Sequence, residues 1–136
     1  MSNGLDASLQ KAVTSIPDCV AAGYVDLSSG MVLSIKTVDS HPAEVFELLA
    51  AATADLFQGP NVSAIEKVFR KARGLPDNDN HHYFQELIVN SDNLIHVFLR
   101  SKRQEQVACF VCRKGANLGM VLTKARGVLP EIEASL

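Results

Sequence analysis

The sequence lacks any long apolar segment, because its apolar runs are short and are interrupted by polar residues. A helix that crosses a bilayer needs about 20 consecutive apolar residues, so a transmembrane helix is excluded. The first residues, Met-Ser-Asn-Gly-Leu-Asp, also lack the basic segment and apolar stretch of a secretory signal peptide. We therefore expect a cytoplasmic protein without membrane insertion.

The chain also has few cysteines and a small net charge. The chain has three cysteines, and an odd number does not form a disulfide framework, which fits a reducing compartment. The formal net charge is −2, so the overall charge gives no indication of binding to nucleic acid.

The composition is that of an ordinary globular domain. The chain has 136 residues, of which 47% are hydrophobic and 21% are charged. This length is sufficient for one sizeable core but too short for two. We therefore predict a single domain over residues 1–136, with no internal repeat or linker.

The first part of the chain predicts a helix followed by a β-hairpin. Leu5, Leu9, Val13 and Ile16 recur at helical spacing, and Pro17 ends the pattern.

Two strand-like segments follow, at residues 20–27 and 31–37, and the turn sequence Ser28-Ser29-Gly30 joins them. Alternation in the second segment predicts one buried and one partly solvent-exposed face. The alternating sets are Met31, Leu33 and Ile35 on one face and Val32, Ser34 and Lys36 on the other.

The middle of the chain predicts a helix in two pieces. The first piece has one apolar stripe, formed by Val45, Leu48, Leu49, Ala52 and Leu56. Gly59-Pro60 stops or sharply kinks this helix.

The second helical piece is predicted to open at Ser63, because Ser63-Ala64-Ile65-Glu66 has the spacing of a capping box. Gly74-Leu75-Pro76 closes it. Its apolar stripe consists of Ile65, Val68, Phe69 and Ala72.

The last part of the chain predicts three strands and a helix. The strands cover residues 83–90, 94–100 and 107–113, and their short connections favour an antiparallel meander. Asn117 is a good N-cap for a helix of about four turns. The element order is therefore α-β-β-α-β-β-β-α, which indicates an α+β fold. The apolar positions of the last helix are Leu118, Val121, Leu122, Ala125, Leu129 and Ile132.

Cys109 and Cys112 have the spacing of a redox or zinc pair. They fall in a predicted strand, however, where residues three apart point to opposite faces about 10 Å from each other. A disulfide needs Cα atoms closer than about 7 Å, and the sequence has no second cysteine pair for zinc. We interpret both as packing or surface thiols.

The segment from Asp77 to His82 begins like a calcium loop but fails at its sixth position, where His82 replaces glycine, and at its twelfth, where Ile88 replaces glutamate. His81 and His82 could hold a transition metal only loosely, so a solvated loop is the favoured interpretation.

The other histidines, His41 and His96, have no recognisable nucleophile signature beside them. Gly115-Ala116-Asn117-Leu118-Gly119 lacks the Lys-Ser/Thr of a nucleotide-binding loop. We therefore predict no catalytic, metal or cofactor site and no enzyme activity.

Two segments resemble the Roadblock family, the dynein-light-chain-like domains. The segment Gly23–Leu33, with sequence GYVDLSSGMVL, resembles the first hairpin of that family, and Ala116–Leu122, with sequence ANLGMVL, resembles the start of its last helix. The element order agrees between these two segments, so the resemblance covers roughly residues 5 to 134.

The resemblance implies a profilin-like, five-stranded antiparallel sheet with the middle helix on one face and the terminal helices on the other. It also implies a homodimer in which the middle helix and the third strand pair across a two-fold axis. Members of the family typically bind and regulate small Ras-like GTPases or act as scaffolds, and they are not known for active-site chemistry. The segment Gly59–Asn80 departs from the family pattern as an elaboration beside the expected dimer strand.

The third strand itself favours pairing with another chain. It is apolar on both faces and has no proline, so an exposed edge there would promote aggregation unless it is covered. A symmetric dimer would cover it; the alternative is an edge covered by the chain's own helix. The predicted dimer interface consists of Leu48, Ala52, Leu56, Tyr83, Gln85, Leu87 and Val89.

The densest basic cluster consists of Lys67, Arg70, Lys71 and Arg73. A helical face with such charges is usually solvated. The functional alternative is an electrostatic docking surface for an acidic partner.

The leading hypothesis is a non-catalytic, homodimeric protein-binding module that regulates or scaffolds a small Ras-like GTPase. One alternative is a domain that senses a small molecule between sheet and helices. Another is a structural assembly subunit without a GTPase partner.

Overall fold

The computed structural model describes residues 3–38, 43–74, 84–102 and 105–136. It contains a five-stranded sheet of order β2-β1-β5-β4-β3, in which every neighbouring pair is antiparallel. The predicted fold class and element order are confirmed, and the middle helix is divided at the predicted place into α2 and α3. The elements are α1 (Asn3–Ser15), β1 (Cys19–Asp26), β2 (Met31–Thr37), α2 (Ala43–Gln58), α3 (Pro60–Ala72), β3 (Glu86–Asn90), β4 (Leu94–Arg100), β5 (Gln106–Arg113) and α4 (Leu118–Ala134).

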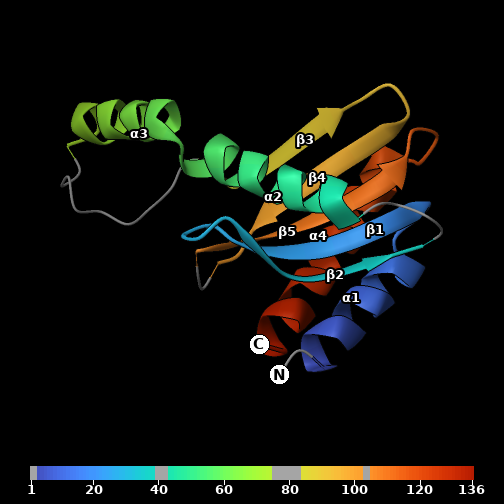
Figure 1. Cartoon of the computed structure of the whole chain (residues 1–136). Coiled ribbons are helices and arrows are strands. Elements are labelled where there is room, and N and C mark those ends of the chain that lie inside the picture. Colours follow the sequence, from blue (N-terminus) through green and yellow to red (C-terminus); the bar gives the residue numbers. More distant parts are fainter. Residues whose placement is uncertain (1–2, 39–42, 75–83, 103–104) are drawn as a thin grey trace.

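The sheet separates two apolar clusters. Helices α1 and α4 cover one face and α2 covers the other, while α3 extends away from the sheet (Figure 1). Alternation along β5 supplies both clusters, because Phe110 and Cys112 point to the α1–α4 side whereas Cys109 and Val111 point to the α2 side. Both faces of the central strands are therefore buried. None of the helices in the described residues is long and apolar enough to span a membrane.

The face prediction for β2 is wrong because of a β-bulge. The register passes from Val25↔Val32 to Tyr24↔Ser34, which leaves Leu33 as the extra residue and shifts the alternation. As a result, Ile35 packs toward the α2 side together with Val32. The exposed fractions of Met31 and Leu33 are 65% and 41%.

The opposite side of β2 contacts α1 through polar side chains. The hydroxyl of Ser34 donates a hydrogen bond to the carboxylate of Asp6, and the Lys36 ammonium lies 3.7 Å from the same group. These contacts hold the outer strand against the first helix.

The predicted capping box at Ser63 is wrong because α3 begins three residues earlier, at Pro60. Proline at the first helical position has the required φ and needs no hydrogen-bond acceptor for its nitrogen. Gly59 is the N-cap, and a Cβ atom there would lie 2.6 Å from the carbonyl oxygen of Asp55. The junction between α2 and α3 therefore requires glycine for space. At the other end, Gly74 has φ +73° and terminates α3 as predicted.

The N-cap prediction for α4 is confirmed, because the Asn117 side chain accepts a hydrogen bond of 3.1 Å from the Met120 amide. The helix continues through Pro130 to Ala134. Its buried face is formed by Val121, Ala125, Val128, Leu129 and Ile132.

Candidate functional site

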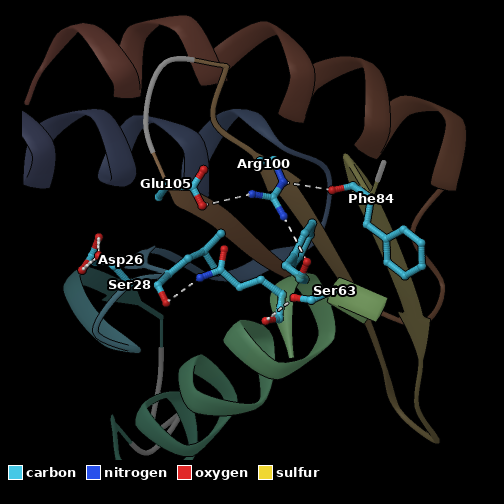
Figure 2. Close-up of polar contacts among 9 residues, drawn as sticks. Asp26, Ser28, Ser63, Phe84, Arg100 and Glu105 are labelled. Atoms are coloured by element: carbon cyan, nitrogen blue, oxygen red, sulfur yellow. Dashed lines mark hydrogen bonds and ion pairs between the residues drawn. The ribbon is translucent and has the colours of Figure 1, made fainter. Parts of the chain in front are cut away.

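A buried arginine at the end of β4 links the elements around the α2–α3 junction. The guanidinium of Arg100 donates to the carbonyl oxygens of Phe84 at 3.0 Å and Phe57 at 3.2 Å (Figure 2). It also lies 5.2 Å from the centre of the Phe57 ring and 3.7 Å from the carboxylate of Glu105. Burial lowers the pKa of Arg100, while the carboxylates of Glu105 and Glu66 act in the opposite direction. One side chain therefore connects α2, β4 and the segment that leads into β3.

A second polar contact fixes the end of α2 relative to the β1–β2 hairpin. The Gln58 amide donates to the carbonyl oxygen of Leu27 at 3.2 Å, and the Ser63 hydroxyl of α3 donates to the carbonyl of Gln58 at 3.3 Å (Figure 2). These contacts set the direction in which α3 leaves the sheet.

The orientation of α3 is unusual, because its apolar side faces outward. Glu66 is only 2% exposed, and Arg70, one helical turn later on the same side, is half-buried. In contrast, Ile65, Val68 and Phe69 are 43%, 66% and 46% exposed. The apolar stripe that the sequence predicts is therefore present but lies at the surface. With Ala64, these three residues line a shallow apolar depression, which we call the α3 apolar face.

The predicted docking residues border the α3 apolar face. Lys67, Lys71 and Arg73 are exposed, whereas Arg70 is half-buried. An apolar centre with a charged rim is the usual organisation of a protein-binding surface. Its binding role stays a prediction.

The residues predicted to form the dimer interface lie on the α2 side of the molecule and at the β3 edge. Ala52 and Leu56 are exposed on α2, and Leu56 retains 42% of its surface. Among the α2 side chains that the structure describes, those of residues 51–58, Thr53 and Phe57 are completely buried, and the predicted stripe did not include them.

On the edge strand and just before it, Gln85 is exposed, Leu87 packs partly against the α2-side cluster, and Val89 is 41% exposed. Tyr83 and the side chain of Leu48 lie outside the described residues. Ala52, Leu56, Gln85 and Val89 thus all present accessible side chains, as an interface requires.

The other side of β3 is fixed to α4. Arg126 donates to the carboxylate of Glu86 with its Nε at 3.0 Å and its Nη2 at 2.7 Å. The hydrogen bond from Arg126 lowers the pKa of Glu86. This bidentate pair holds β3 against α4. The outer edge of β3 is the one that faces away from β4.

The sequence candidates for chemistry are not brought together by the fold. Cys109 and Cys112 point to opposite sides of the sheet, as predicted. His96 is half-buried and stacks on Phe98 at 6.4 Å between ring centres. His41 and the segment from Asp77 to His82 lie outside the described residues. In the part of the chain that the structure describes, no three His, Cys, Asp or Glu side chains are grouped as metal ligands would be.

The sequence interpretation missed Arg100 and the pairing of Cys19 with Cys112. A signal for Arg100 exists, because it shares strand parity with Phe98 and therefore points into the same apolar layer. Cys19 and Cys112 are far apart in the chain, so only the strand register places them opposite each other.

No protein-family profile matches the chain, and no curated protein sequence matches it. Solved structures do match over nearly its whole length. The gliding protein MglB from Thermus thermophilus is similar, with a TM-score of 0.70, 16% identity, and coverage of 97% of this chain and 87% of that chain. A Roadblock/LC7 domain from Streptomyces avermitilis has a TM-score of 0.65 and 12% identity, with coverage of 95% and 94%. A structure described as MglB with a tetrameric arrangement has a TM-score of 0.67 and 17% identity, with coverage of 97% and 90%.

Proposed function

We propose that this chain, which has a Roadblock-like fold, is a non-catalytic protein-binding module that forms a homodimer and regulates or scaffolds a small Ras-like GTPase. The observation that carries the proposal is the accessible apolar surface at one edge of the sheet and on α3. Such surfaces on a folded chain mark sites that bind another polypeptide.

The homodimer is supported by the position and character of β3. This strand lies at one end of the sheet order and pairs with β4. Its Ile88 and Val89 are each 41% exposed, on opposite faces of the strand. Two copies joined edge to edge through β3 would pair the outer backbone groups and cover these side chains. The described tetrameric arrangement of MglB is consistent with self-association in proteins of this fold.

The GTPase partner is supported by the family resemblance of the two segments and by the Roadblock-like fold. The α3 apolar face, with Lys67 and Lys71 beside it, supplies a surface with both apolar and electrostatic complementarity for an acidic partner. Arg100 and Gln58 hold the end of α2, the helix that directly precedes α3.

A direct test is to mix the purified full-length chain with small Ras-like GTPases of the same organism, loaded with GDP or with a GTP analogue. We expect binding of at least one GTPase, with or without a change in its hydrolysis rate. A changed rate indicates regulation, and binding at an unchanged rate indicates scaffolding. Absence of binding to all of them in both nucleotide states contradicts the GTPase proposal.

The docking surface is tested by the double substitution Lys67→Glu and Lys71→Glu. Both side chains are exposed, so thermal stability is expected to stay nearly unchanged while GTPase affinity falls about tenfold or more. Lys124→Glu on α4 is the control, because it changes an exposed lysine on the other side of the sheet. An unaltered affinity of the double variant excludes this basic surface as the docking site.

A further inference from the structure

Cys19 and Cys112 are partners in the β1–β5 ladder, at its end, where the register shifts between Cys19 and Ala21. Both side chains belong to the apolar cluster on the α1–α4 side of the sheet, so they point in the same direction. The ladder continues past the pair, where the Arg113 amide donates to the carbonyl oxygen of Asp18 at 3.0 Å. Backbone hydrogen bonds between β5 and the start of β1 therefore fix the position of the two cysteines relative to each other.

Directly opposed residues of an antiparallel pair have Cα atoms about 4.5–5.5 Å apart. A disulfide forms over Cα separations of about 4.4–6.8 Å. The strand pairing therefore brings Cys19 and Cys112 into the range in which an S–S bond forms, in contrast to Cys109 and Cys112, which lie on opposite faces.

The two thiols are in contact, and the contact shifts their pKa values in opposite directions. The hydrogen bond from Cys112 lowers the pKa of Cys19, and the same contact raises the pKa of Cys112. The contact between the two thiols therefore favours the thiolate on Cys19 over the thiolate on Cys112. When protonated, its Sγ donates to the carbonyl of Ala21 at 3.2 Å.

Cys19 is also the more accessible thiol. It is the first residue of β1, directly after the exposed Asp18, and it retains 7% exposure against 0% for Cys112. Cys109 is 1% exposed on the other side of the sheet, and burial raises its pKa. The chain therefore contains one pair of thiols in contact and one buried thiol on the other side of the sheet.

We propose that Cys19 and Cys112 form an oxidisable dithiol, in which Cys19 reacts first with a peroxide and Cys112 then closes an intrachain disulfide. The disulfide would tie the start of the first strand to the end of the last one. In a reducing compartment such a bond is transient, so the pair is a site of reversible oxidation.

The reaction balances with hydrogen peroxide as the oxidant. The Cys19 thiolate attacks one peroxide oxygen, the O–O bond breaks, and the released hydroxide takes a proton from solvent to leave as water. The product is a sulfenic acid on Cys19. The Cys112 sulfur then attacks the Cys19 sulfur, the S–O bond breaks, and the hydroxide leaves as water with the Cys112 proton. The dithiol loses two electrons and the peroxide gains them.

The experiment treats the reduced full-length chain with hydrogen peroxide, removes the peroxide, and counts thiols after unfolding in the presence of an alkylating agent. We expect the number of thiols per chain to fall from three to one without formation of a covalent dimer. The number should return to three after addition of a dithiol reductant. Mass spectrometry of tryptic peptides under non-reducing conditions should link the peptide that contains Cys19 to the peptide that contains Cys109 and Cys112.

Three variants assign the bond. Cys109→Ser should still lose both remaining thiols, whereas Cys19→Ser and Cys112→Ala should form no intrachain disulfide. If Cys112→Ala does not fold, fragmentation of the linked peptide between Cys109 and Cys112 still assigns the bond in the unsubstituted chain. A link to Cys109, an intermolecular bond only, irreversible oxidation of Cys19 with Cys112 still reduced, or three surviving thiols would each overturn the proposal.

Discussion

The guanidinium of Arg100 satisfies two backbone carbonyls and compensates buried carboxylate charge at the place where α2, α3 and β4 meet. A charged group in such a position is costly to bury unless it is hydrogen-bonded and paired. Its removal is costly too, because the groups it satisfies then lose their partner. The single residue therefore stabilises the contact between the end of α2, β4 and the segment that leads into β3.

We predict that Arg100→Met lowers the free energy of unfolding by about 2 kcal/mol, because the carbonyls of Phe84 and Phe57 lose a donor. Arg100→Lys should cost less, since one ammonium keeps the charge but cannot reproduce the forked contact. Urea titration followed by circular dichroism measures both. Equal stability of Arg100→Met and the unsubstituted chain would contradict the structural role given to this arginine.

Asp26, at the β1–β2 turn, makes a pH-dependent contribution to the stability of the fold. Its carboxylate accepts hydrogen bonds from the Ser29 hydroxyl at 2.7 Å, from the Ser29 amide at 3.1 Å and from the Ser28 hydroxyl at 3.0 Å. These bonds, that of the Ser29 hydroxyl first, lower the pKa of Asp26 below 3.8. Because the folded-state pKa is depressed, the stabilisation is complete above the unfolded-state pKa and is lost as the pH falls through the folded-state pKa.

We predict that Asp26→Ala lowers the free energy of unfolding by about 1 kcal/mol at pH 7. The difference from the unsubstituted chain should shrink as the pH falls below 3.8. Denaturant titrations at several pH values measure this. A difference that stays constant down to the acid-unfolding range would show that the carboxylate charge is not the cause.

Alternation in the sequence was sufficient to predict that Cys109 and Cys112 point apart, since this depends on local strand geometry alone. It could not predict that Cys19 faces Cys112, because the register between β1 and β5 depends on contacts between distant segments.

At the level of elements, the junction between α2 and α3 determines where the α3 apolar face points. The kink follows from Gly59 and Pro60, of which the glycine avoids a clash with the carbonyl oxygen of Asp55 and the proline starts the new helix. The sequence correctly predicted a break at this place. It misplaced the helix start because a capping-box spacing at Ser63 competed with the proline signal.

We predict that Gly59→Ala destabilises the chain by about 1–3 kcal/mol, because the added Cβ meets backbone and cannot be accommodated by a side-chain movement. Gly127→Ala is the matched control. Gly127 lies in α4 with no atom within 4 Å of the added Cβ, so alanine there should stabilise by about 0.5–1 kcal/mol. Thermal unfolding of the two variants should shift in opposite directions, and a neutral Gly59→Ala would contradict a tight junction.

The bulge in β2 is an element-level feature that the hydrophobic pattern of the sequence could not predict. The alternation of Met31, Leu33 and Ile35 is real in the sequence, but one unpaired residue in the hairpin reverses which side chains meet the core. Nothing in the local pattern distinguishes an alternating strand with a bulge from one without.

For the whole molecule, the element order and the two family-like segments were enough to predict the antiparallel sheet with helices on both faces. Order and hydrophobic spacing constrain such a small α+β domain strongly, because few arrangements bury all of its apolar stripes. They did not predict that the stripe of α3 stays at the surface of the single chain. That property depends on Glu66 and Arg70 being turned inward.

We propose that, in the whole molecule, the β3 edge and the side chains beside it bind a second copy of the chain. The substitution Val89→Glu introduces a charge on the exposed edge strand, which should oppose burial of this surface in a dimer. Met31→Glu is the matched control, because Met31 is 65% exposed on β2, the strand at the other end of the sheet. Both positions are solvent-accessible, so neither change is expected to unfold the chain.

The most direct measurement is sedimentation velocity of the three proteins at micromolar concentration. For the unsubstituted protein and for Met31→Glu we expect twice the mass of one chain, which is 14.7 kDa. For Val89→Glu we expect the mass of a single chain. An unsubstituted protein that sediments as a monomer, or a Val89→Glu protein that remains as dimeric as Met31→Glu, would contradict this proposal.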